Sequence, residues 1–294
     1  MTPYSGTPFS LKRLIVDHAF WIRKLVWPTL DIFDYVYRAL NGKIHLPPLS
    51  ARQKVAGSFF ASIAEFEVIG SDAVRLLREV TQMESSHSIL DIGCGCGRTA
   101  FPLLAFLNPS TKYYGGDVDR AMVKWCTKNI TTSHPNSAFF HIEAYNSFYN
   151  PDFKNSASAY TFPIPEASIN RVIMVSVFTH MLPDDIQNYL REIARMLMPD
   201  GIALISFFIT NPQRLEGPQG SVIRSKFPFD KGAWRVASEK YPELDISFDQ
   251  EFVNQMIHAA GLEYQQPILW GKWTGEAGFS GHDFVALRRR NQGT

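Results

Sequence analysis

The stretch Ile89-Leu90-Asp91-Ile92-Gly93-Cys94-Gly95-Cys96-Gly97-Arg98 decides the fold of this 294-residue chain. Its first four residues, with Ser88 ahead of them, predict a short buried strand, and residues 98–107 predict a helix. Between the two, every second residue from 93 to 97 is glycine, which is needed where backbone turns sharply and lets a ligand approach without a Cβ in the way. A strand, a glycine turn and a helix N-terminus together predict a nucleotide-binding crossover.

The spacing of the glycines separates two kinds of nucleotide site. The dinucleotide fingerprint G-x-G-x-x-G, which would indicate an NAD-dependent oxidoreductase, needs glycine at position 98, where this chain has arginine. The chain instead reads Asp-x-Gly-x-Gly-x-Gly from Asp91, which resembles the first motif of the class I S-adenosylmethionine-dependent methyltransferases. The oxidoreductase is kept as the competing interpretation, to be separated by titration with S-adenosylmethionine and with NADH.

The resemblance implies a set of residues that bind S-adenosylmethionine. Asp91 would provide or orient an anion for the amino-acid end of the cofactor. Asp117, at the end of the second predicted strand, matches the acid that accepts both ribose hydroxyls in the family, and Glu143 matches an acid that meets the adenine amino group. The expected cofactor-binding residues are Asp91, Gly93, Cys94, Gly95, Gly97, Asp117, Val118, Glu143, Ala144, Ser176 and Phe178.

From residue 88 onward, predicted strands alternate with predicted helices, which is the pattern of an α/β fold with a parallel sheet. The five parallel strands are predicted at 88–92, 112–117, 138–142, 171–176 and 202–209. A last pair, at 262–270 and 282–288, resembles the sixth strand and the antiparallel seventh strand of the methyltransferase fold. We therefore expect a seven-stranded Rossmann-like sheet with helices on both faces, in a domain that spans residues 86–294.

Two stretches are longer than a plain crossover requires, and such insertions generally carry function. One is the loop over residues 145–168, and the other is the stretch over residues 211–247. In the family that the chain resembles, these segments form the acceptor pocket and its lid. We expect residues 211–247 to be an insertion on the acceptor side of the site.

Residues 1–85 predict a helical N-terminal extension. Apolar residues at helical spacing predict a helix over 11–26 that Pro28 interrupts, followed by a second helix over 32–40. Ser50 predicts the start of a third helix, and Ser71-Asp72 the cap of a fourth. The basic, aromatic first helix is expected to cover the cofactor pocket as a lid or to pack against the partner subunit of a homodimer, and a peripheral contact with a membrane stays open as the alternative.

Composition narrows the partners and the compartment. The formal net charge is +1, and no Asn-Pro-Pro-Tyr-type element follows the fourth strand, so no nucleic-acid partner is expected. Three cysteines and no signal peptide fit a reducing, cytoplasmic compartment. Cys94-x-Cys96 lacks a second pair of ligands at the required spacing, so no metal is expected.

Methyl transfer from a sulfonium needs donor, methyl and acceptor held in line, and needs a base only for an acceptor such as an alcohol. We expect a small-molecule acceptor, with O-methylation of a secondary metabolite, sugar or lipid-like compound. The alternatives are N- or C-methylation of a small molecule, or a non-catalytic protein that binds S-adenosylmethionine or a membrane. His180 follows the fourth strand and is the candidate catalytic base, although a histidine there also occurs merely to hydrogen-bond the backbone.

Overall fold

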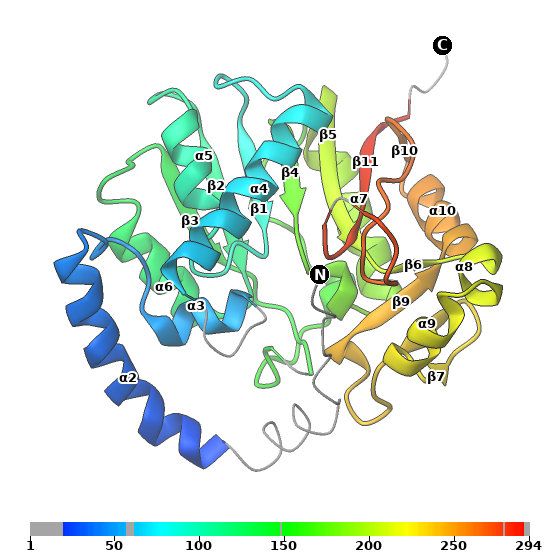
Figure 1. The fold of residues 1–294 in the computed structure, drawn as a ribbon. Helices are drawn as coiled ribbons and strands as arrows, with labels where there is room; N and C mark the ends of the chain where they lie inside the picture. Colours follow the sequence, from blue (N-terminus) through cyan, green and yellow to red (C-terminus); the bar gives the residue numbers. More distant parts are fainter. Residues whose placement is uncertain (1–19, 57–61, 148, 279, 291–294) are drawn as a thin grey trace. The chain divides into compact units, whose positions relative to one another are not determined.

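The computed structural model describes residues 20–56, 62–147, 149–278 and 280–290, and the chain divides into two compact units between Glu67 and Val68. Figure 1 shows the order of the elements. The helices are α2 (Phe20–Leu40), α3 (Leu49–Ala56), α4 (Ile63–Thr81), α5 (Ala100–Phe106), α6 (Arg120–Asn129), α7 (Pro183–Met196), α8 (Pro212–Glu216), α9 (Gly220–Lys226) and α10 (Gln250–Ala259). Three short 3-10 helices are η1 (Ala157–Ala159), η2 (Phe178–His180) and η3 (Pro242–Leu244).

Seven strands form one sheet in the order β10-β11-β5-β4-β1-β2-β3. Strands β1 to β5 run parallel, and β11 lies antiparallel to β5 and to β10. This order confirms the predicted seven-stranded methyltransferase sheet with its antiparallel seventh strand. The bounds are β1 (Ile89–Ile92), β2 (Tyr113–Asp117), β3 (Ser137–His141), β4 (Ile169–Met174), β5 (Leu197–Phe207), β10 (Leu262–Tyr264) and β11 (Asp283–Arg289).

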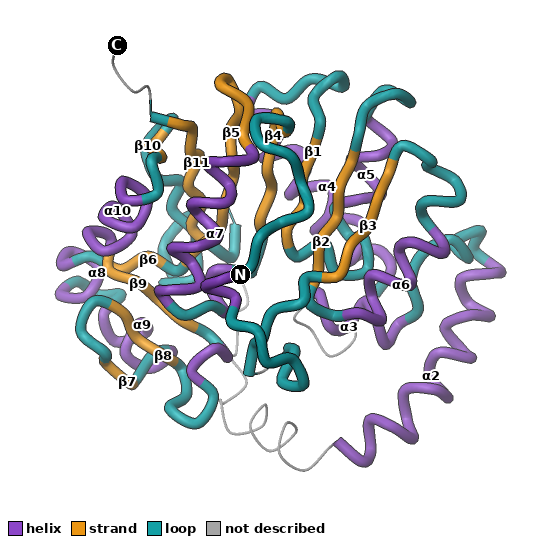
Figure 2. The backbone as a smooth tube through the Cα atoms, turned by 180° about the vertical axis from the view of Figure 1, so that it is seen from behind, coloured by secondary structure: helices purple, strands orange, loops and turns teal. Residues whose placement is uncertain are grey.

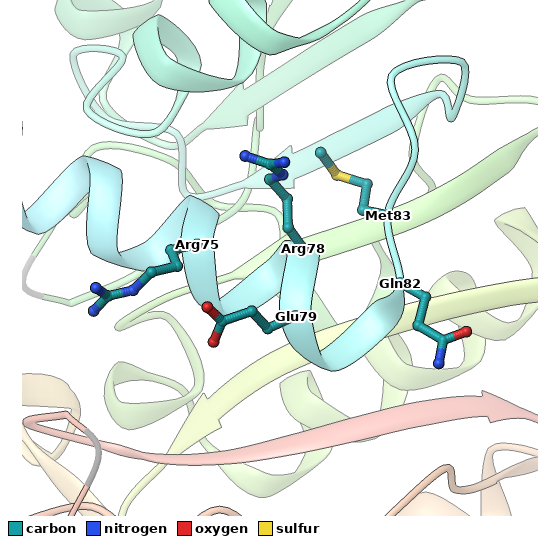
Figure 3. Close-up of a pocket in the computed structure, with 5 residues that line it drawn as sticks. All are labelled: Arg75, Arg78, Glu79, Gln82 and Met83. Atoms are coloured by element: carbon teal, nitrogen blue, oxygen red, sulfur yellow. The ribbon is translucent and has the colours of Figure 1, made fainter.

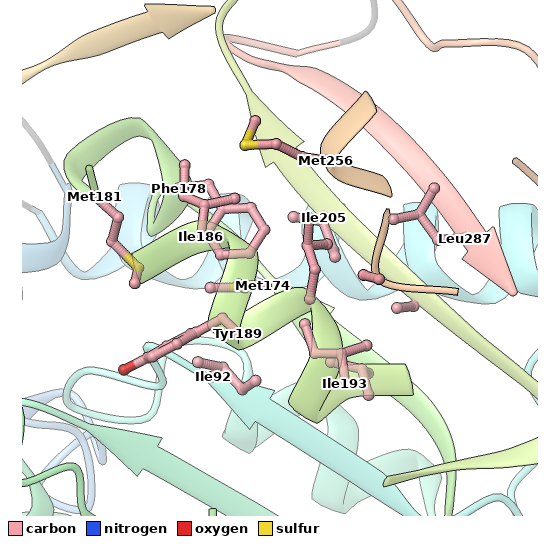
Figure 4. Packing of buried hydrophobic residues seen from close by; sticks show 14 of the residues in the cluster. Ile92, Met174, Phe178, Met181, Ile186, Tyr189, Ile193, Ile205, Met256 and Leu287 are labelled. Atoms are coloured by element: carbon pink, nitrogen blue, oxygen red, sulfur yellow. The ribbon is translucent and has the colours of Figure 1, made fainter. Parts of the chain in front are cut away.

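Helices cover both faces of this sheet (Figures 1 and 2). On one face, α7 and α10 bury the apolar residues of a large core, part of which Figure 4 shows around Ile186, Tyr189 and Met256. On the other face, α4, α5 and α6 bury a second cluster, which includes Leu77, Leu103 and Cys126. Burial on both faces explains why the strands read as continuous apolar runs.

The stretch between β5 and α10 was predicted only as an insertion. It contains α8, α9 and η3, and it supplies all four strands of a second sheet in the order β6-β9-β8-β7. Alternation of apolar residues is weak in strands this short, which is why the sequence does not reveal them. The bounds are β6 (Ile209–Thr210), β7 (Phe229–Asp230), β8 (Trp234–Val236) and β9 (Ile246–Asp249).

The helices ahead of the sheet differ from the prediction in two places. Pro28 does not separate two helices, because α2 continues through it from Phe20 to Leu40. The fourth helix does not begin at Ser71-Asp72: α4 begins eight residues earlier, where the Ser62 hydroxyl accepts a hydrogen bond of 3.0 Å from the Glu65 backbone N–H. The pair Ser62-x-x-Glu65 is a capping-box pattern that the prediction overlooked.

The first unit is organised around a buried acid. Asp34 of α2 pairs with Arg38 at 2.7 Å and with Arg52 of α3 at 2.6 Å, so one carboxylate joins the two helices. Burial raises the pKa of Asp34, but the hydrogen bonds and charges of the two arginines outweigh it and leave that pKa below its usual value. The predicted helix over residues 11–26 lies mostly outside the described residues, and no helix among those described is long and apolar enough to cross a membrane.

Candidate active site

The glycine loop turns directly after β1 and is fixed to the neighbouring strand. Gly93, Gly95 and Gly97 have φ angles of 80°, 53° and 86°, in the left-handed region that residues with a Cβ rarely adopt. The backbone N–H of Gly93 donates to the carbonyl of Gly116 at 2.7 Å. A Cβ on Gly93 would overlap the side chain of Val177, which follows β4. The loop after β1 therefore packs against the loop after β4 at a position that only glycine allows.

Asp117 closes the other side of this loop. It is the last residue of β2, and its two carboxylate oxygens accept hydrogen bonds of 2.7 Å from the backbone N–H groups of Gly95 and Asp119. The predicted ribose acid is thus held against the glycine loop in an orientation that backbone groups determine.

Asp91 lies inside the protein, beneath the same loop. It is 2% exposed and accepts a hydrogen bond of 2.8 Å from the hydroxyl of Tyr113 on β2. Burial raises the pKa of Asp91 to about 6, although the hydrogen bonds from Tyr113 and Thr99 oppose the rise. Its partners are therefore internal, and its contact with a cofactor stays a prediction.

The cysteines of the loop are structural in character. Cys94, Cys96 and Cys126 are all free and buried, and the thiol of Cys126 donates to the Gly95 carbonyl at 3.4 Å. Burial raises the pKa of Cys96, which keeps that thiol protonated. Within the described ranges, no group of three or more His, Cys, Asp or Glu side chains is arranged to hold a metal ion.

The ends of β2 and β3 lie side by side and bring the predicted adenine residues together. The backbone N–H of Ile142 donates to Asp117 O at 2.9 Å, and a ring nitrogen of His141 bonds Val118 O at 2.9 Å. Glu143 extends outward with 62% of its side chain exposed, whereas Ala144 is buried. Glu143 is thus accessible to a ligand, and its reach to adenine stays a prediction.

Ser176 connects three strands at the end of β4. Its φ of 57° is unusual for a residue with a side chain, and such strain concentrates at functional sites. Its backbone N–H donates to the Ser206 hydroxyl of β5 at 2.7 Å, and its own hydroxyl shares a hydrogen bond of 3.1 Å with His282, just ahead of β11. Burial, together with the positive charges of Lys226 and Arg98, lowers the pKa of His282 to about 3, so this imidazole is neutral.

Phe178 and His180, the two site residues predicted after Ser176, have different surroundings. Phe178 is fully buried and packs with Tyr189 and Phe207 in the core (Figure 4). His180 lies 5.2 Å from the Tyr149 ring, centroid to centroid, and its Nδ1 donates to the Leu244 carbonyl at 2.7 Å. Because a carbonyl only accepts, the proton of the neutral ring is on Nδ1 and the lone pair is on Nε2. Burial lowers the pKa of His180 and favours this neutral form.

Glu243, an acid that the sequence did not single out, connects the loop after β3 to the insertion over residues 211–247. Glu243 of η3 is 4% exposed and accepts hydrogen bonds of 2.9 Å from the Asn146 side chain and 2.7 Å from the Ser147 backbone. Asn146 also donates to the His180 carbonyl at 3.0 Å. The loop after β3, the loop after β4 and the insertion over residues 211–247 therefore meet at one polar cluster. No motif marks Glu243, because its partner is 97 residues away.

The base of the insertion is attached to the main sheet by one more buried carboxylate. Asp283, the first residue of β11, accepts hydrogen bonds of 2.7 Å from the Ile209 and Gly271 backbones and from the Trp273 indole. It also pairs with Arg214 of α8 at 3.2 Å. These four donors fix the start of the insertion beside the end of β5.

The structure also has surface depressions elsewhere. One is lined by Arg75, Arg78, Glu79, Gln82 and Met83, at the end of α4 that leads toward the start of β1 (Figure 3). In open parallel sheets, ligands bind outside the carboxyl ends of the strands, and this depression lies toward the amino end of β1. The site is therefore assigned on chemistry, at the ends of β1, β2 and β4.

Comparisons with known proteins concern the family and the fold. Residues 89–201 match a family model described as a methyltransferase domain. The PH0226 protein from Pyrococcus horikoshii OT3 has a similar fold, with a TM-score of 0.52 at 15% identity over 77% of this chain and 92% of that chain. The domain match confirms the predicted methyltransferase domain, and the structural neighbour has the predicted fold.

The curated relatives concern the acceptor. The tRNA N(3)-cytidine methyltransferase METTL2 of Gallus gallus is 31% identical over 188 residues, which are 63% of this chain and 45% of the relative. The protein of the same name from Bos taurus is 28% identical, over 63% of this chain and 44% of the relative. The human METTL2B, also named a tRNA N(3)-cytidine methyltransferase, is 24% identical over 79% of this chain and 53% of the relative. The chain spans about half the length of these relatives.

These relatives contradict two expectations. The small-molecule acceptor, with O-methylation as its chemistry, was wrong, and so was the exclusion of a nucleic-acid partner. The exclusion failed because a net charge of +1 is a sum over the whole chain and does not describe the local field at the site. The positive charges of Lys226 and Arg98 both lower the pKa of His282, and the net charge of the whole chain does not reveal this local positive charge.

Proposed function

We propose that this chain, which carries a class I S-adenosylmethionine-dependent methyltransferase domain, transfers the methyl group of S-adenosylmethionine to N3 of a cytidine in RNA. The observation that carries the proposal is the similarity to the tRNA N(3)-cytidine methyltransferases of Gallus gallus and Bos taurus. Transfer RNA is accordingly the first class of RNA to test.

The residues at the ends of β1 and β2 fit S-adenosylmethionine. Gly93 packs against the Val177 side chain at a φ of 80°, so the backbone of the loop after β1 is fixed. The Asp117 carboxylate is oriented by the backbone N–H groups of Gly95 and Asp119, as the binding of a ribose diol requires. When bound, the cofactor supplies an activated methyl group on a positively charged sulfur.

Cytidine N3 is a suitable nucleophile without a base. Its lone pair is available at neutral pH, so the N3–CH₃ bond forms as the S–CH₃ bond breaks, and the bonding pair of that bond stays on sulfur. The positive charge thereby moves from the sulfonium to the base, and no proton leaves before the transfer. On this chemistry the protein has to position the base, exclude water and stabilise the cation that forms. His180 is then free to act in positioning, through its hydrogen bond to Leu244.

The acceptor side has the local charge that an RNA substrate requires. Lys226 lies over the Phe208 ring, 3.7 Å from its centroid, and its charge acts on His282 together with that of Arg98. Phosphate groups that flank an extruded nucleotide would meet these cations beside the end of β4. Methylation should therefore weaken as the salt concentration rises, which transfer to an uncharged metabolite would not do.

The direct test is incubation of the purified chain with tRNA and isotopically labelled S-adenosylmethionine, followed by nucleoside mass spectrometry. The expected product is labelled 3-methylcytidine, formed by the wild type and lost in Asp117→Ala. Loss of the Asp117 carboxylate should weaken cofactor binding by roughly 1–3 kcal/mol, the range for hydrogen bonds to a charged group. Labelled methyl on another nucleoside, or no label in RNA while the chain still binds S-adenosylmethionine, would refute the proposal.

Three further proposals concern the cellular location, the N-terminal residues and the oligomeric state. The free thiols of Cys94, Cys96 and Cys126 support a cytoplasmic location. Residues 1–85 are proposed to control access of the acceptor to the site, and a homodimer stays open. Deleting residues 1–40 should leave a folded protein with altered acceptor kinetics, and an insoluble product would show that these residues belong to the core.

A further inference from the structure

One carboxylate at this edge of the sheet differs from its neighbours in having no hydrogen-bond donor. The other buried acids each accept hydrogen bonds from the protein: Asp91 from Tyr113, Asp117 from Gly95 and Asp119, Glu243 from Asn146 and Ser147, and Asp283 from four groups. Among the described residues, the side-chain oxygens of Asp245 accept none. The Nδ1 of His180 lies 4.0 Å from Asp245 Oδ1 and already donates to the Leu244 carbonyl.

The backbone holds Asp245 in a fixed place beside the polar cluster. The residue directly follows η3, in extended conformation, and its carbonyl accepts a hydrogen bond of 3.0 Å from the Ala237 N–H. The residue before it binds His180, and Glu243, two residues before it, binds the loop after β3. The carboxylate is 30% exposed, so it is neither free in solvent nor enclosed.

Asp245 lies close to residues of both long loops. Its Oδ1 is 4.0 Å from Nδ1 of His180, and the Tyr149 ring packs edge-on against His180. The charges of Asp245 and Asp117 both raise the pKa of the Tyr149 hydroxyl, after the larger effect of burial, so Tyr149 lies within reach of both acids. The neighbouring hydroxyls of Ser147 and Thr179 are buried without a hydrogen-bond partner in the described part of the chain. Polar groups with unfilled hydrogen-bonding capacity are therefore close to Asp245.

A carboxylate at this place distinguishes cytosine from uracil. Cytosine has a 4-amino group next to N3, and a carboxylate accepts a hydrogen bond from it, whereas the O4 of uracil would repel the carboxylate. Methylation of N3 also makes the base a cation, and the 4-amino group shares that charge. A carboxylate that binds this group therefore interacts more strongly with the product-like transition state than with the ground state, which is the condition for catalysis.

We propose that Asp245 accepts a hydrogen bond from the 4-amino group of the target cytidine, and so both selects cytidine and stabilises the cation formed at N3. This inference rests on the proposed function and deepens it. Asp245 would touch the acceptor and no part of the cofactor.

The first experiment compares Asp245→Asn with the wild type in methylation of tRNA and in binding of S-adenosylmethionine. We expect kcat/KM for RNA to fall roughly 10- to 100-fold, the range for loss of one good base contact, with cofactor affinity unchanged. The matched control is Asp230→Asn, the same change in the same insertion, where the acid pairs with Arg235 on the strand β8. Unaltered kcat/KM in Asp245→Asn would overturn the inference.

The second experiment asks whether Asp245 contacts the amino group itself. Binding is measured in the presence of S-adenosylhomocysteine, for an RNA with cytidine at the target position and for one with 2-pyrimidinone, a base that lacks the 4-amino group. The wild type should lose roughly tenfold or more in affinity, and Asp245→Ala, which has no side-chain acceptor, should lose almost nothing further. Asp245→Asn keeps an uncharged acceptor oxygen and should lose less than the wild type. Equal losses in all three proteins would overturn the inference.

Different results would refute the proposed function and the role of Asp245. A wild type that binds S-adenosylmethionine and forms no 3-methylcytidine in RNA refutes the proposed function. A wild type that forms 3-methylcytidine, with an equally active Asp245→Asn, refutes only the role of Asp245.

Discussion

The two halves of the site are built in different ways. The cofactor half, at the ends of β1, β2 and β3, is held by backbone groups of neighbouring strands, as in the bonds from Gly95 to Asp117 and from Gly93 to Gly116. The acceptor half, at the ends of β4 and β5 and on the insertion, is held by side chains that are far apart in the chain. Asn146 and Glu243 are 97 residues apart, and Ser176 and His282 are 106 apart. We expect the local, backbone-built half to keep one cofactor, and the half assembled from distant side chains to change its acceptor more readily.

The largest effect is expected from breaking the cofactor half. In Gly93→Ala, the added Cβ overlaps Val177 and the residue must keep a φ near 80°, so binding of S-adenosylmethionine should fall below detection by isothermal titration calorimetry. The matched control is Gly232→Ala, which has a φ of 87° but has no atom within 4 Å of the new Cβ. The control should lose only about 1–2 kcal/mol of stability from the backbone conformation and keep its cofactor affinity. Equal binding by the two variants would show that the loop is not in contact with the cofactor.

The corresponding break in the acceptor half is Glu243→Ala. Hydrogen bonds to a charged group contribute roughly 1.5–3 kcal/mol each, and the change leaves the buried donors of Asn146 and Ser147 without their acceptor. We expect the free energy of unfolding to fall by about 3 kcal/mol and KM for RNA to rise, with cofactor affinity retained. Glu239→Ala, at an acid that is 60% exposed and pairs with Lys231, should change neither quantity by a measurable amount. Loss of cofactor binding in Glu243→Ala would show that the two halves are not separable.

Acid should act on the two halves with opposite signs. Asp91 has a folded-state pKa of about 6, above its usual 3.8, so its contribution to stability is full below about 3.8 and is lost as pH rises through 6. His282 has a folded-state pKa of about 3, below its usual 6.5, so its contribution is full above 6.5 and is lost as pH falls toward 3. Between pH 7 and pH 5, the wild type should gain about 1 kcal/mol relative to Asp91→Asn and lose about 2 kcal/mol relative to His282→Gln.

Urea unfolding of the wild type and both variants at the two pH values measures these differences. Because each comparison is made with the wild type at the same pH, titration of the other groups cancels. The same sign for both variants would show that one of the two buried groups is solvated in the folded protein.

The smallest effect is expected at His180. Attack by cytidine N3 removes no proton, so His180→Ala should reduce turnover by less than about tenfold, through the lost hydrogen bond to Leu244, and should leave the pH profile unchanged. If His180 is instead the general base predicted for an alcohol acceptor, turnover falls roughly 10²- to 10⁴-fold and a limb near pH 6–7 disappears. Single-turnover rates from pH 5.5 to 8.5 separate the two outcomes.

The difference between the halves also determines what the sequence could predict. Alternating glycines and an acid one strand later form a local pattern, because the turn and the neighbouring strand impose their geometry within about 25 residues, and they indicated the family and the sheet order. The helix boundaries predicted from Pro28 and Ser71-Asp72 were wrong. A proline or a capping residue gives only a local preference, which the rest of a long helix overrides.

The acceptor half could not be predicted in the same way. Glu243 and Asp245 stand in Tyr-Pro-Glu-Leu-Asp, a segment with no motif, and what they contact depends on how the insertion folds back over the sheet. Ser176 was expected at the site, but its left-handed backbone and its bond to His282 follow from tertiary structure alone. The nature of the acceptor was predicted wrongly for the same reason, because total charge and the lack of one motif describe the chain and not the pocket.

The insertion begins and ends at adjacent points of the fold. Its entry strand β6 pairs with its exit strand β9, the Thr210 hydroxyl donates to Asp249 at 2.6 Å, and the Asn211 side chain donates to Gln250 at 3.2 Å. A segment whose two ends are already joined costs little chain entropy to lengthen, shorten or exchange. Residues 211–247 can thus be exchanged as a unit. A homologous segment inserted between Thr210 and Phe248 should keep the pairing of β6 with β9 and the hydrogen bond from Thr210 to Asp249. Recombination at these two positions therefore offers a direct route to enzymes with new substrates.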